Sequence, residues 1–260
     1  PGHDLEHHLG HDDLDLLGHS PGADDERADL PEDDVDREED AQMDAATRRS
    51  AADAAALAPE LRLLEQMATI ARSSRYAADS RLKALLAWIR EHQCPDLGRD
   101  RAAWLPRRLL VFTEYADTKR YLQQQLAEAI RGSDRAADRI QTFHGGIGEE
   151  RREEIKAAFN ADPHTHPLRI LIATDAAREG VNLQNHCFDL FHFDVPWNPG
   201  RLEQRNGRID RKLQKSDEVN CHYFVLPQRA EDRVLEVLVR KTREIHERLG
   251  SLPPIVERRM

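Results

Sequence analysis

The chain has 260 residues, enough for one large domain or two small ones, and its 48 acidic and 38 basic side chains give a formal net charge of −10. No run of about 18 apolar residues is present, which excludes a membrane-spanning helix. The first twenty residues are acidic and rich in histidine, which excludes a secretory signal. Cys94, Cys187 and Cys221 are odd in number and lie far apart, so the sequence excludes a disulfide framework or a zinc ribbon and favours the cytoplasm.

The charge is distributed unevenly along the chain. Residues 1–50 contain 17 acids and 4 bases, a balance of −13, which leaves 31 acids and 34 bases, a balance of +3, in residues 51–260. Residues 1–50 also lack Phe, Trp, Tyr and Ile, so they are predicted to be a disordered or solvated leader. The histidines at 3, 7, 8 and 11 favour a polar low-complexity segment over a metal site. Because the chain begins with Pro1, we expect it to be a piece of a longer protein.

Patterns of apolar residues predict the regular elements in chain order. Helical spacing predicts two lead-in helices over 61–71 and 82–89, the second capped by Asp79. Short apolar or alternating runs predict strands at 109–112, 139–143, 168–174, 188–195 and 219–225. Capping signals predict one helix that begins after Asp117 and another that begins after Asn198. Acidic residues predict the first turn of a third helix near Glu149, and an amphipathic pattern predicts a last helix over 231–249.

Strands and helices alternate at short spacing, which predicts an α/β fold with a mostly parallel central sheet and helices on both faces. No internal repeat is visible. We therefore divide the chain into an acidic, histidine-rich leader or linker at 1–58, lead-in helices at 59–106, an α/β lobe at 107–228, and a C-terminal brace helix and tail at 229–260.

The segment 204–211, Gln-Arg-Asn-Gly-Arg-Ile-Asp-Arg, is rich in guanidinium groups. On a continuous helix, Gln204, Arg208 and Arg211 would share one face, beside Gly207. A glycine inside a helix costs about 1 kcal/mol relative to alanine, so it suggests close approach of a backbone or ligand. The face would recognise an anion, and the alternative interpretation is an ordinary solvated helix face.

A second polar segment follows the predicted strand that ends at Thr174. It contains Gly180 and Asn182, a glycine that permits close backbone approach and a short polar side chain two residues later. In open α/β sheets, ligands bind beyond the carboxyl ends of the strands, where loop amides face outward. The alternative interpretation is an ordinary loop.

These segments together resemble the motifs of superfamily-two helicases. The run ATDAAREGVNL, at 173–183, resembles motif V, and WNPGRLEQRNGRIDR, at 197–211, resembles motif VI in its Swi/Snf-type form. Residues 110–115 resemble motif IV, and His144-Gly145-Gly146 resembles the segment before the next helix of the family. The resemblance runs from about 79 to 227 and is greatest to the bacterial branch that includes the RNA-polymerase-recycling translocase and phage-defence helicases.

The resemblance implies that the chain is the second RecA-like lobe of an ATP-driven motor that moves along nucleic acid. Such a lobe is a three-layer domain, and the resemblance favours DNA over RNA as the nucleic acid. It implies that Arg208 and Arg211 reach ATP as arginine fingers and that Gln204 helps to position them. The other residues it marks form two groups: Gly180, Asn182 and Gly207 for coupling to ATP, and Thr174, Gly145, Gly146 and Asn198 for the nucleic-acid backbone. Where the family often has small residues in motif V, this chain has Arg178 and Glu179.

The chain contains no Gly-Lys dipeptide and therefore no P-loop, and neither of its Asp-Glu pairs follows a predicted buried strand. We therefore expect ATP and Mg²⁺ to be held mainly by a first RecA-like lobe of the same polypeptide. A second hypothesis is a non-catalytic RecA-like module whose acidic leader docks on a basic protein partner. A small-molecule enzyme of doubly wound fold would need a Gly-rich strand-to-helix turn, which the sequence lacks.

Overall fold

Short apolar runs form a six-stranded parallel sheet in the computed structural model, which describes residues 58–74, 77–175, 182–196, 198–211, 214–226, 237, 240 and 255–259. The strand order is β2-β3-β1-β4-β5-β6, and every neighbouring pair is parallel. The strands are β1 (Leu109–Thr113), β2 (Ile140–Phe143), β3 (Ile170–Thr174), β4 (Asp189–His192), β5 (Val219–Tyr223) and β6 (Ile255–Arg259). The predicted α/β class with a parallel sheet is confirmed.

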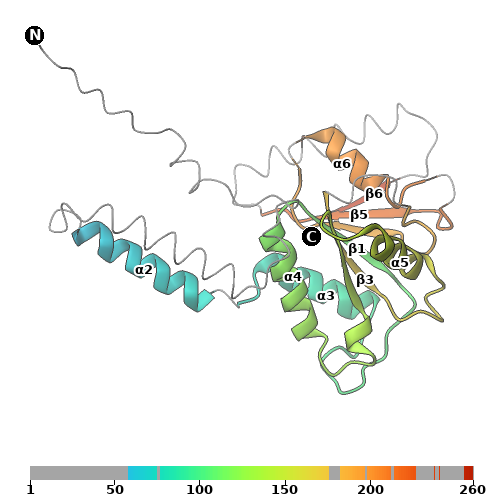
Figure 1. Cartoon of the computed structure of the whole chain (residues 1–260), viewed down its shortest axis with the longest axis horizontal. Helices are drawn as coiled ribbons and strands as arrows, with labels where there is room; N and C mark the ends of the chain where they lie inside the picture. Colours follow the sequence, from blue (N-terminus) through green and yellow to red (C-terminus); the bar gives the residue numbers. More distant parts are fainter. Residues whose placement is uncertain are drawn as a thin grey trace, which may run out of the picture.

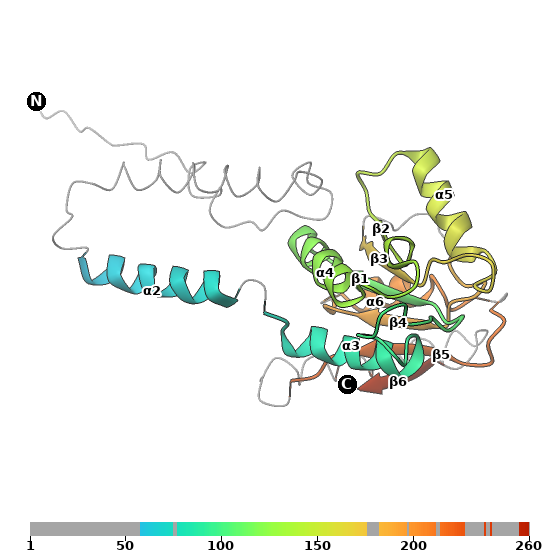
Figure 2. The same cartoon turned by 90° about the horizontal axis from the view of Figure 1, so that it is seen from below.

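Helices cover both faces of this sheet (Figures 1 and 2). Alternate residues of β1 point to opposite faces, so Leu109 and Val111 pack with α3 (Ser80–His92) and α4 (Ala116–Ala129). Leu110 and Phe112 pack in a second core with α5 (Glu149–Asn160). All five β1 side chains are buried, because a central parallel strand is covered on both sides.

Two predicted helix starts are confirmed by their capping hydrogen bonds. Asp79 precedes α3, and its Oδ1 accepts a hydrogen bond of 2.7 Å from the backbone N–H of Leu82. Asn198 precedes α6 (Pro199–Asn206), and its Oδ1 accepts one of 2.8 Å from Gly200. Pro199 occupies the first turn, where its missing N–H would have had no helical partner.

Two details of the helix predictions are wrong. Asp117 does not cap α4, because that helix begins at Ala116 after Tyr115, and Asp117 lies in its first turn, where an acid favours the helix dipole. The helix through motif VI is shorter than predicted: α6 ends at Asn206, and Gly207 is its C-cap rather than an interior residue. The helical spacing of Gln204, Arg208 and Arg211 is therefore interrupted.

Residues 255–259 form β6, which pairs with β5. The sequence instead predicts a tail without regular structure at these positions. Three of the five residues of β6 are charged, a composition that suits a sheet edge but gives little strand signal. The predicted helix over 231–249 lies outside the described residues apart from 237 and 240, and the acidic leader at 1–58 lies outside them apart from residue 58. The three cysteines are buried and free, as expected.

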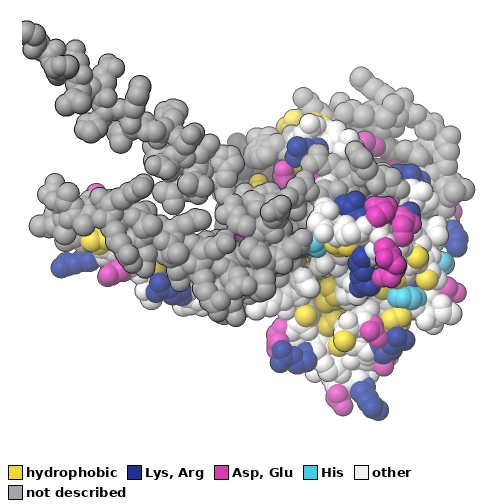
Figure 3. Space-filling model, viewed as in Figure 1, with side chains coloured by type: hydrophobic (Ala, Val, Ile, Leu, Met, Phe, Trp, Pro, Cys, Tyr) yellow, Lys and Arg dark blue, Asp and Glu magenta, His cyan; other side chains and the backbone are white. Residues whose placement is uncertain are grey.

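The first lead-in helix, α2 (Ala58–Ser74), lies apart from the lobe in both views (Figures 1 and 2). Its large apolar side chains are exposed, among them Leu63, Met67 and Ile70. No helix within the described ranges is long and apolar enough to cross a membrane. On the face of the lobe seen in Figure 3, basic and acidic side chains are interspersed.

Candidate functional site

Polar side chains gather where β1, β3 and β4 end. The register pairs Thr113 with Thr174 and Phe112 with His192, so the carboxyl ends of these strands lie at one edge of the sheet. Asp175 follows β3 directly, and α6 begins a few residues after β4. This is the edge at which open parallel sheets bind ligands.

Arg205, on α6, is the central group of this edge. Its guanidinium donates from Nε and Nη2 to the two carboxylate oxygens of Asp175, at 2.6 and 2.9 Å. It also donates from Nη1 to the backbone oxygen of Asp194 at 2.7 Å, and its centre lies 5.5 Å from the ring of Phe112. Because Arg205 is only 2% exposed, these contacts fix α6 against the ends of β3 and β4.

Asp194, which follows β4, connects Arg205 to the end of β1. Its carboxylate accepts hydrogen bonds from the Thr113 hydroxyl and, at 2.9 Å, from the Glu114 N–H. Burial raises the pKa of Asp194, although Arg205 and the two hydrogen bonds act in the opposite direction. The Glu114 side chain in turn pairs with Arg201 of α6 at 2.9 Å. Motif IV, motif V and motif VI therefore meet through hydrogen-bonded side chains.

His192, the last residue of β4, holds the end of α6. Its Nε2 lies 2.9 Å from Oδ1 of Asn206, and both residues are buried. Burial lowers the pKa of His192 to about 3, so the ring is neutral at physiological pH. The neutral ring therefore donates its Nε2 proton to the amide oxygen of Asn206.

The turn after α6 carries the two predicted finger residues. Arg208 is 9% exposed, and its backbone oxygen accepts a hydrogen bond from Leu183 in the motif V segment. Burial lowers the pKa of Arg208, Arg211 lowers it further, and Asp175 acts in the opposite direction. Arg211 is half-buried and donates from Nε to the backbone oxygen of Gly207 at 2.8 Å. The turn therefore holds two neighbouring guanidiniums, and this concentration of positive charge favours binding of an anion.

Gln204 is exposed and shares a small hollow with Arg201, Arg205 and Arg208. The hollow has a volume of about 10 Å³, room for roughly one water molecule. The edge therefore offers donors to an anion presented from outside, and it does not enclose a nucleotide. Residues 204 and 208 stay near each other although the helix ends between them.

The other predicted residues that the structure describes do not form one cluster with these side chains. Gly145 and Gly146 form the turn after β2, where the carbonyl oxygen of Gly145 accepts a bond from Arg152. Asn182 is exposed, and its backbone oxygen accepts a bond of 2.6 Å from Asn160. Gly180 lies outside the described residues.

Thr174, Asn198 and Gly207 have local structural contacts. Thr174 is fully buried, and its hydroxyl has no hydrogen-bond partner among the described residues. Asn198 is exposed and caps α6. A Cβ added to Gly207 would lie 3.3 Å from the backbone oxygen of Glu203, so the glycine permits a close approach within the turn.

Sequence reasoning missed three residues that build this edge: Arg205, Asp194 and His192. Helical spacing could have indicated that Arg205 is buried. Arg205 and Asn206 follow Leu202 by three and four residues, and these three residues form the buried face of α6. No comparable signal marked His192, which is one polar residue at the end of an apolar run. Within the described part of the chain, His, Cys, Asp and Glu side chains form no group that could hold a metal ion.

Comparisons with known proteins agree with the motif assignment. Residues 105–212 match the family model described as the helicase conserved C-terminal domain. The uncharacterized ATP-dependent helicase YqhH of Bacillus subtilis is 34% identical over 149 residues, which are 57% of this chain and 24% of that protein. The RNA polymerase-associated protein RapA of Vibrio campbellii is 32% identical over 145 residues, 56% of this chain and 13% of that protein.

The chain thus spans about a quarter or less of the length of these curated relatives. Among solved structures, the C-terminal part of the Fun30 ATPase domain superposes with a TM-score of 0.49 and 18% identity. That superposition covers 63% of this chain and 46% of the other.

Proposed function

We propose that the chain is the second RecA-like lobe of an ATP-driven DNA translocase, because residues 105–212 match the family model of the helicase conserved C-terminal domain. The chain as printed lacks a P-loop, so the proposed role is one half of an ATP-hydrolysing enzyme. On its own it is inactive. ATP and Mg²⁺ are held mainly by the first lobe of the same polypeptide.

The observation that carries the proposal is the rigid attachment of the motif VI segment. Arg205 ties α6 to Asp175 and Asp194 at the ends of two strands. A finger must be held in position before its anion arrives, because reorganisation at the moment of reaction would reduce its effect. The buried ion pair meets this requirement for the turn that holds Arg208 and Arg211.

In this proposal, Arg208 and Arg211 face the phosphates of ATP bound by the first lobe. Hydrolysis of ATP supplies the free energy for movement. The two guanidiniums stabilise the negative charge that develops on the phosphoryl oxygens, and Gln204 helps to orient them. Gly180, Asn182 and Gly207 couple the two lobes to nucleotide.

Nucleic acid is proposed to lie along the same edge of the sheet. The exposed residues Asn198 and Gly146 are available to the phosphate backbone, and Gly145 permits its close approach. Thr174 is assigned to this surface from its place in motif V alone, because its side chain is fully buried. The Swi/Snf form of motif VI favours duplex DNA as the track.

The remaining assignments extend the proposal along the chain. The motor lobe spans 107–228, lead-in helices at 59–106 connect it to the first lobe, and 229–260 brace it. The acidic leader at 1–58 is assigned to a basic protein partner, because its charge opposes a direct contact with DNA. The motor is placed in the cytoplasm.

The test is DNA-stimulated ATP hydrolysis by the whole protein that contains this chain. We expect Arg211→Ala to lower kcat by about 10³-fold, because a finger acts on the transition state. The KM for ATP should change little, since the first lobe holds the ground state. Arg211 is half-buried with one side-chain bond to a carbonyl, so its removal should leave the lobe folded.

Arg99→Ala is the matched control, because Arg99 is an exposed arginine whose one ion pair within the described part of the chain is with Asp96, at 2.8 Å. Its turnover should equal that of the wild type. If Arg211→Ala also turns over at the wild-type rate, the finger assignment fails and the non-catalytic module becomes the better description.

A further inference from the structure

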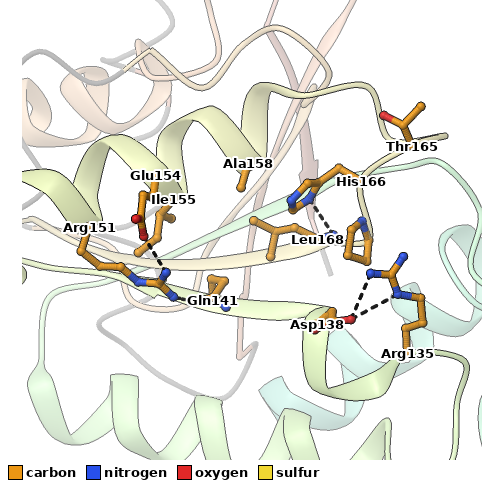
Figure 4. Close-up of a pocket in the computed structure, with 11 residues that line it drawn as sticks. Arg135, Asp138, Gln141, Arg151, Glu154, Ile155, Ala158, Thr165, His166 and Leu168 are labelled. Atoms are coloured by element: carbon orange, nitrogen blue, oxygen red, sulfur yellow. Dashed lines mark hydrogen bonds and ion pairs between the residues drawn. The ribbon is translucent and has the colours of Figure 1, made fainter.

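A groove with a volume of about 530 Å³ lies between α5, β2 and the loop that leads into β3 (Figure 4). The 3₁₀ helix η4 (Ala136–Asp138), which precedes β2, forms one end of it. η4 and the loop into β3 lie at the amino ends of β2 and β3, opposite the strand ends that form the candidate functional site, and α5 runs alongside. No assigned residue of that site lines it.

The groove runs beside a strand with an open edge. Among the described residues, β2 is the terminal strand and pairs only with β3. The N–H of Ile170 donates to the oxygen of Arg139, so in a parallel ladder Gln141 and Phe143 also face β3. The backbone groups of Ile140 and Thr142 therefore point outward. Such an edge accepts an additional strand.

The groove has an apolar centre and charged ends. Ile155, Ala158 and Leu168 line its centre. At one end Arg151 pairs with Glu154 at 2.8 Å and also reaches the side-chain oxygen of Gln141 at 3.3 Å. Figure 4 shows these three side chains converging from α5 and β2.

At the other end Arg135 pairs with Asp138 at 3.1 Å. Arg135 has a left-handed backbone with φ of 51°, a conformation that is uncommon for a residue with a side chain. In both pairs the partners are three residues apart and about half exposed. Exposed pairs of this kind are weak, so both guanidiniums can exchange their present partners for others.

Buried cations lie behind this groove. Arg169 is 5% exposed and donates to backbone carbonyls, among them Pro163 and His166, which solvate its charge without neutralising it. Arg108 is fully buried, and none of its guanidinium nitrogens has a hydrogen-bond partner among the described residues. Burial lowers the pKa of His166; Arg108, Arg135 and Arg169 lower it further, and Asp138 acts in the opposite direction. The four guanidiniums in and behind the groove outnumber the two carboxylates that line it, Asp138 and Glu154, so added negative charge is favoured there.

We propose that this groove binds an extended acidic peptide segment of a partner protein, which adds to the free edge of β2. Side chains of an added strand alternate between the two faces of the sheet. Residues i, i+2 and i+4 of the peptide would then face the groove, with carboxylates at i and i+4 on Arg135 and Arg151 and a small apolar side chain at i+2. The ligand pattern is acid-x-apolar-x-acid.

A nucleic acid fits these features less well. Asp138 and Glu154 lie at the two ends, so they would repel the continuous charge of a phosphate chain more than the two separated carboxylates of the peptide. The apolar centre and the outward backbone groups of Ile140 and Thr142 have no role with a phosphate backbone. Peptide binding here does not depend on the proposed motor function.

The test uses the 260-residue chain and a fluorescently labelled peptide with the core Glu-Thr-Val-Thr-Glu, followed by fluorescence anisotropy. A peptide of the same composition, Thr-Glu-Val-Glu-Thr, places its acids on the opposite face from Val and is the register control. We expect saturable binding of the first peptide and about tenfold weaker binding of the second. Equal binding of the two would overturn the proposed register.

The double variant Arg135→Ala/Arg151→Ala should bind about tenfold more weakly than wild type, and Arg99→Ala should bind as wild type. Thr142→Pro removes an outward N–H without removing a bond to β3, so it should weaken binding, whereas Thr142→Ala should not. Thermal unfolding of each variant checks that the lobe is intact. Equal loss in Arg99→Ala, or unchanged binding in both groove variants, would contradict the proposal.

A photoreactive side chain locates the occupant directly. Thr165 lines the groove and is exposed, so Thr165→p-benzoylphenylalanine should cross-link to the added peptide. Cross-linking to residues 1–57 of the same chain instead would assign the groove to the acidic leader and overturn a partner protein as occupant. Displacement of the peptide by a DNA oligonucleotide, with loss of the cross-link, would also overturn the peptide assignment.

Discussion

Arg205 and Asp175 form a bidentate ion pair that joins α6 to the end of β3. The Nε–Oδ1 and Nη2–Oδ2 distances are 2.6 and 2.9 Å, and the two side chains are only 2% and 7% exposed. Arg205 also binds the backbone oxygen of Asp194. A single buried side chain therefore sets the position of the turn that carries Arg208 relative to two strand ends.

The first prediction concerns the stability that depends on this pair. Arg205→Ala leaves the carboxylate of Asp175 buried without its bidentate partner, so we expect a loss of about 3–5 kcal/mol in the free energy of unfolding. Urea unfolding at pH 7 measures it. Arg201→Ala is the control, because its pair with Glu114 is part-exposed and should be worth about 1 kcal/mol or less. Similar losses in the two variants would show that Arg205 is not the anchor.

The fold could be predicted because its signals are local. β1 and β3 each consist of four apolar residues and a threonine and are buried throughout, and Asp79 and Asn198 are caps recognisable from their residue type. β6 could not be predicted, because a charged edge strand is defined by its partner β5 rather than by its own composition.

The site was only partly predictable. Motif VI predicts Arg208 and Arg211 as finger residues, but the helix predicted to carry them is too long, because Gly207 is the C-cap of α6 and not an interior residue. The contact between Arg205 and Asp175 joins residues 30 positions apart and arises from the sheet order, which brings the ends of β3 and β4 beside α6. No pattern within either segment contains that information.

The second prediction concerns pH and His192. Its pKa is about 3 in the folded protein, below the ordinary value near 6.5, so between these values the unfolded chain binds a proton that the native state does not. The stability from this residue is therefore present above pH 6.5 and is lost as the pH falls toward 3, by at most about 1.4 kcal/mol per pH unit.

His192→Gln tests this dependence, because a glutamine amide can still donate to Asn206 but does not titrate. The free energy of unfolding of the variant should fall less steeply than that of wild type between pH 6.5 and 4.5. Urea unfolding across this range provides the comparison. Parallel curves for the two proteins would mean that His192 does not contribute to the acid sensitivity.

The third prediction concerns the turn after α6. Gly207 has φ of −62°, which alanine can adopt, but the added Cβ would lie 3.3 Å from the Glu203 backbone oxygen. We therefore expect Gly207→Ala to destabilise the lobe, by about 1 kcal/mol. Gly148→Ala is the control, since a Cβ there meets nothing within 4 Å. In a helix interior, replacing glycine by alanine is stabilising. If Gly207→Ala also stabilises the lobe, the backbone of the turn can move away from the added Cβ, and the predicted steric cost is wrong.

The fourth prediction concerns the opposite end of β4, where Arg107 pairs with the fully buried Asp189. Arg107 donates from Nε and Nη2 at 2.7 and 2.9 Å, and His222 lies 3.5 Å from the same carboxylate. Burial raises the pKa of Asp189, but the hydrogen bonds from His222 and Arg107 outweigh it and hold the pKa below its usual value. The carboxylate therefore adds stability above the ordinary carboxyl pKa and loses it in acid.

Arg107→Met keeps the aliphatic stem beside Trp88 and Phe188 but removes the charge from the pair. The pKa of Asp189 should then rise, and the variant should lose about 3 kcal/mol of unfolding free energy at pH 7. The difference from wild type should shrink near pH 3, where the wild type also loses this contribution. Urea unfolding at the two pH values distinguishes this from a packing defect, which would lower the stability equally at both.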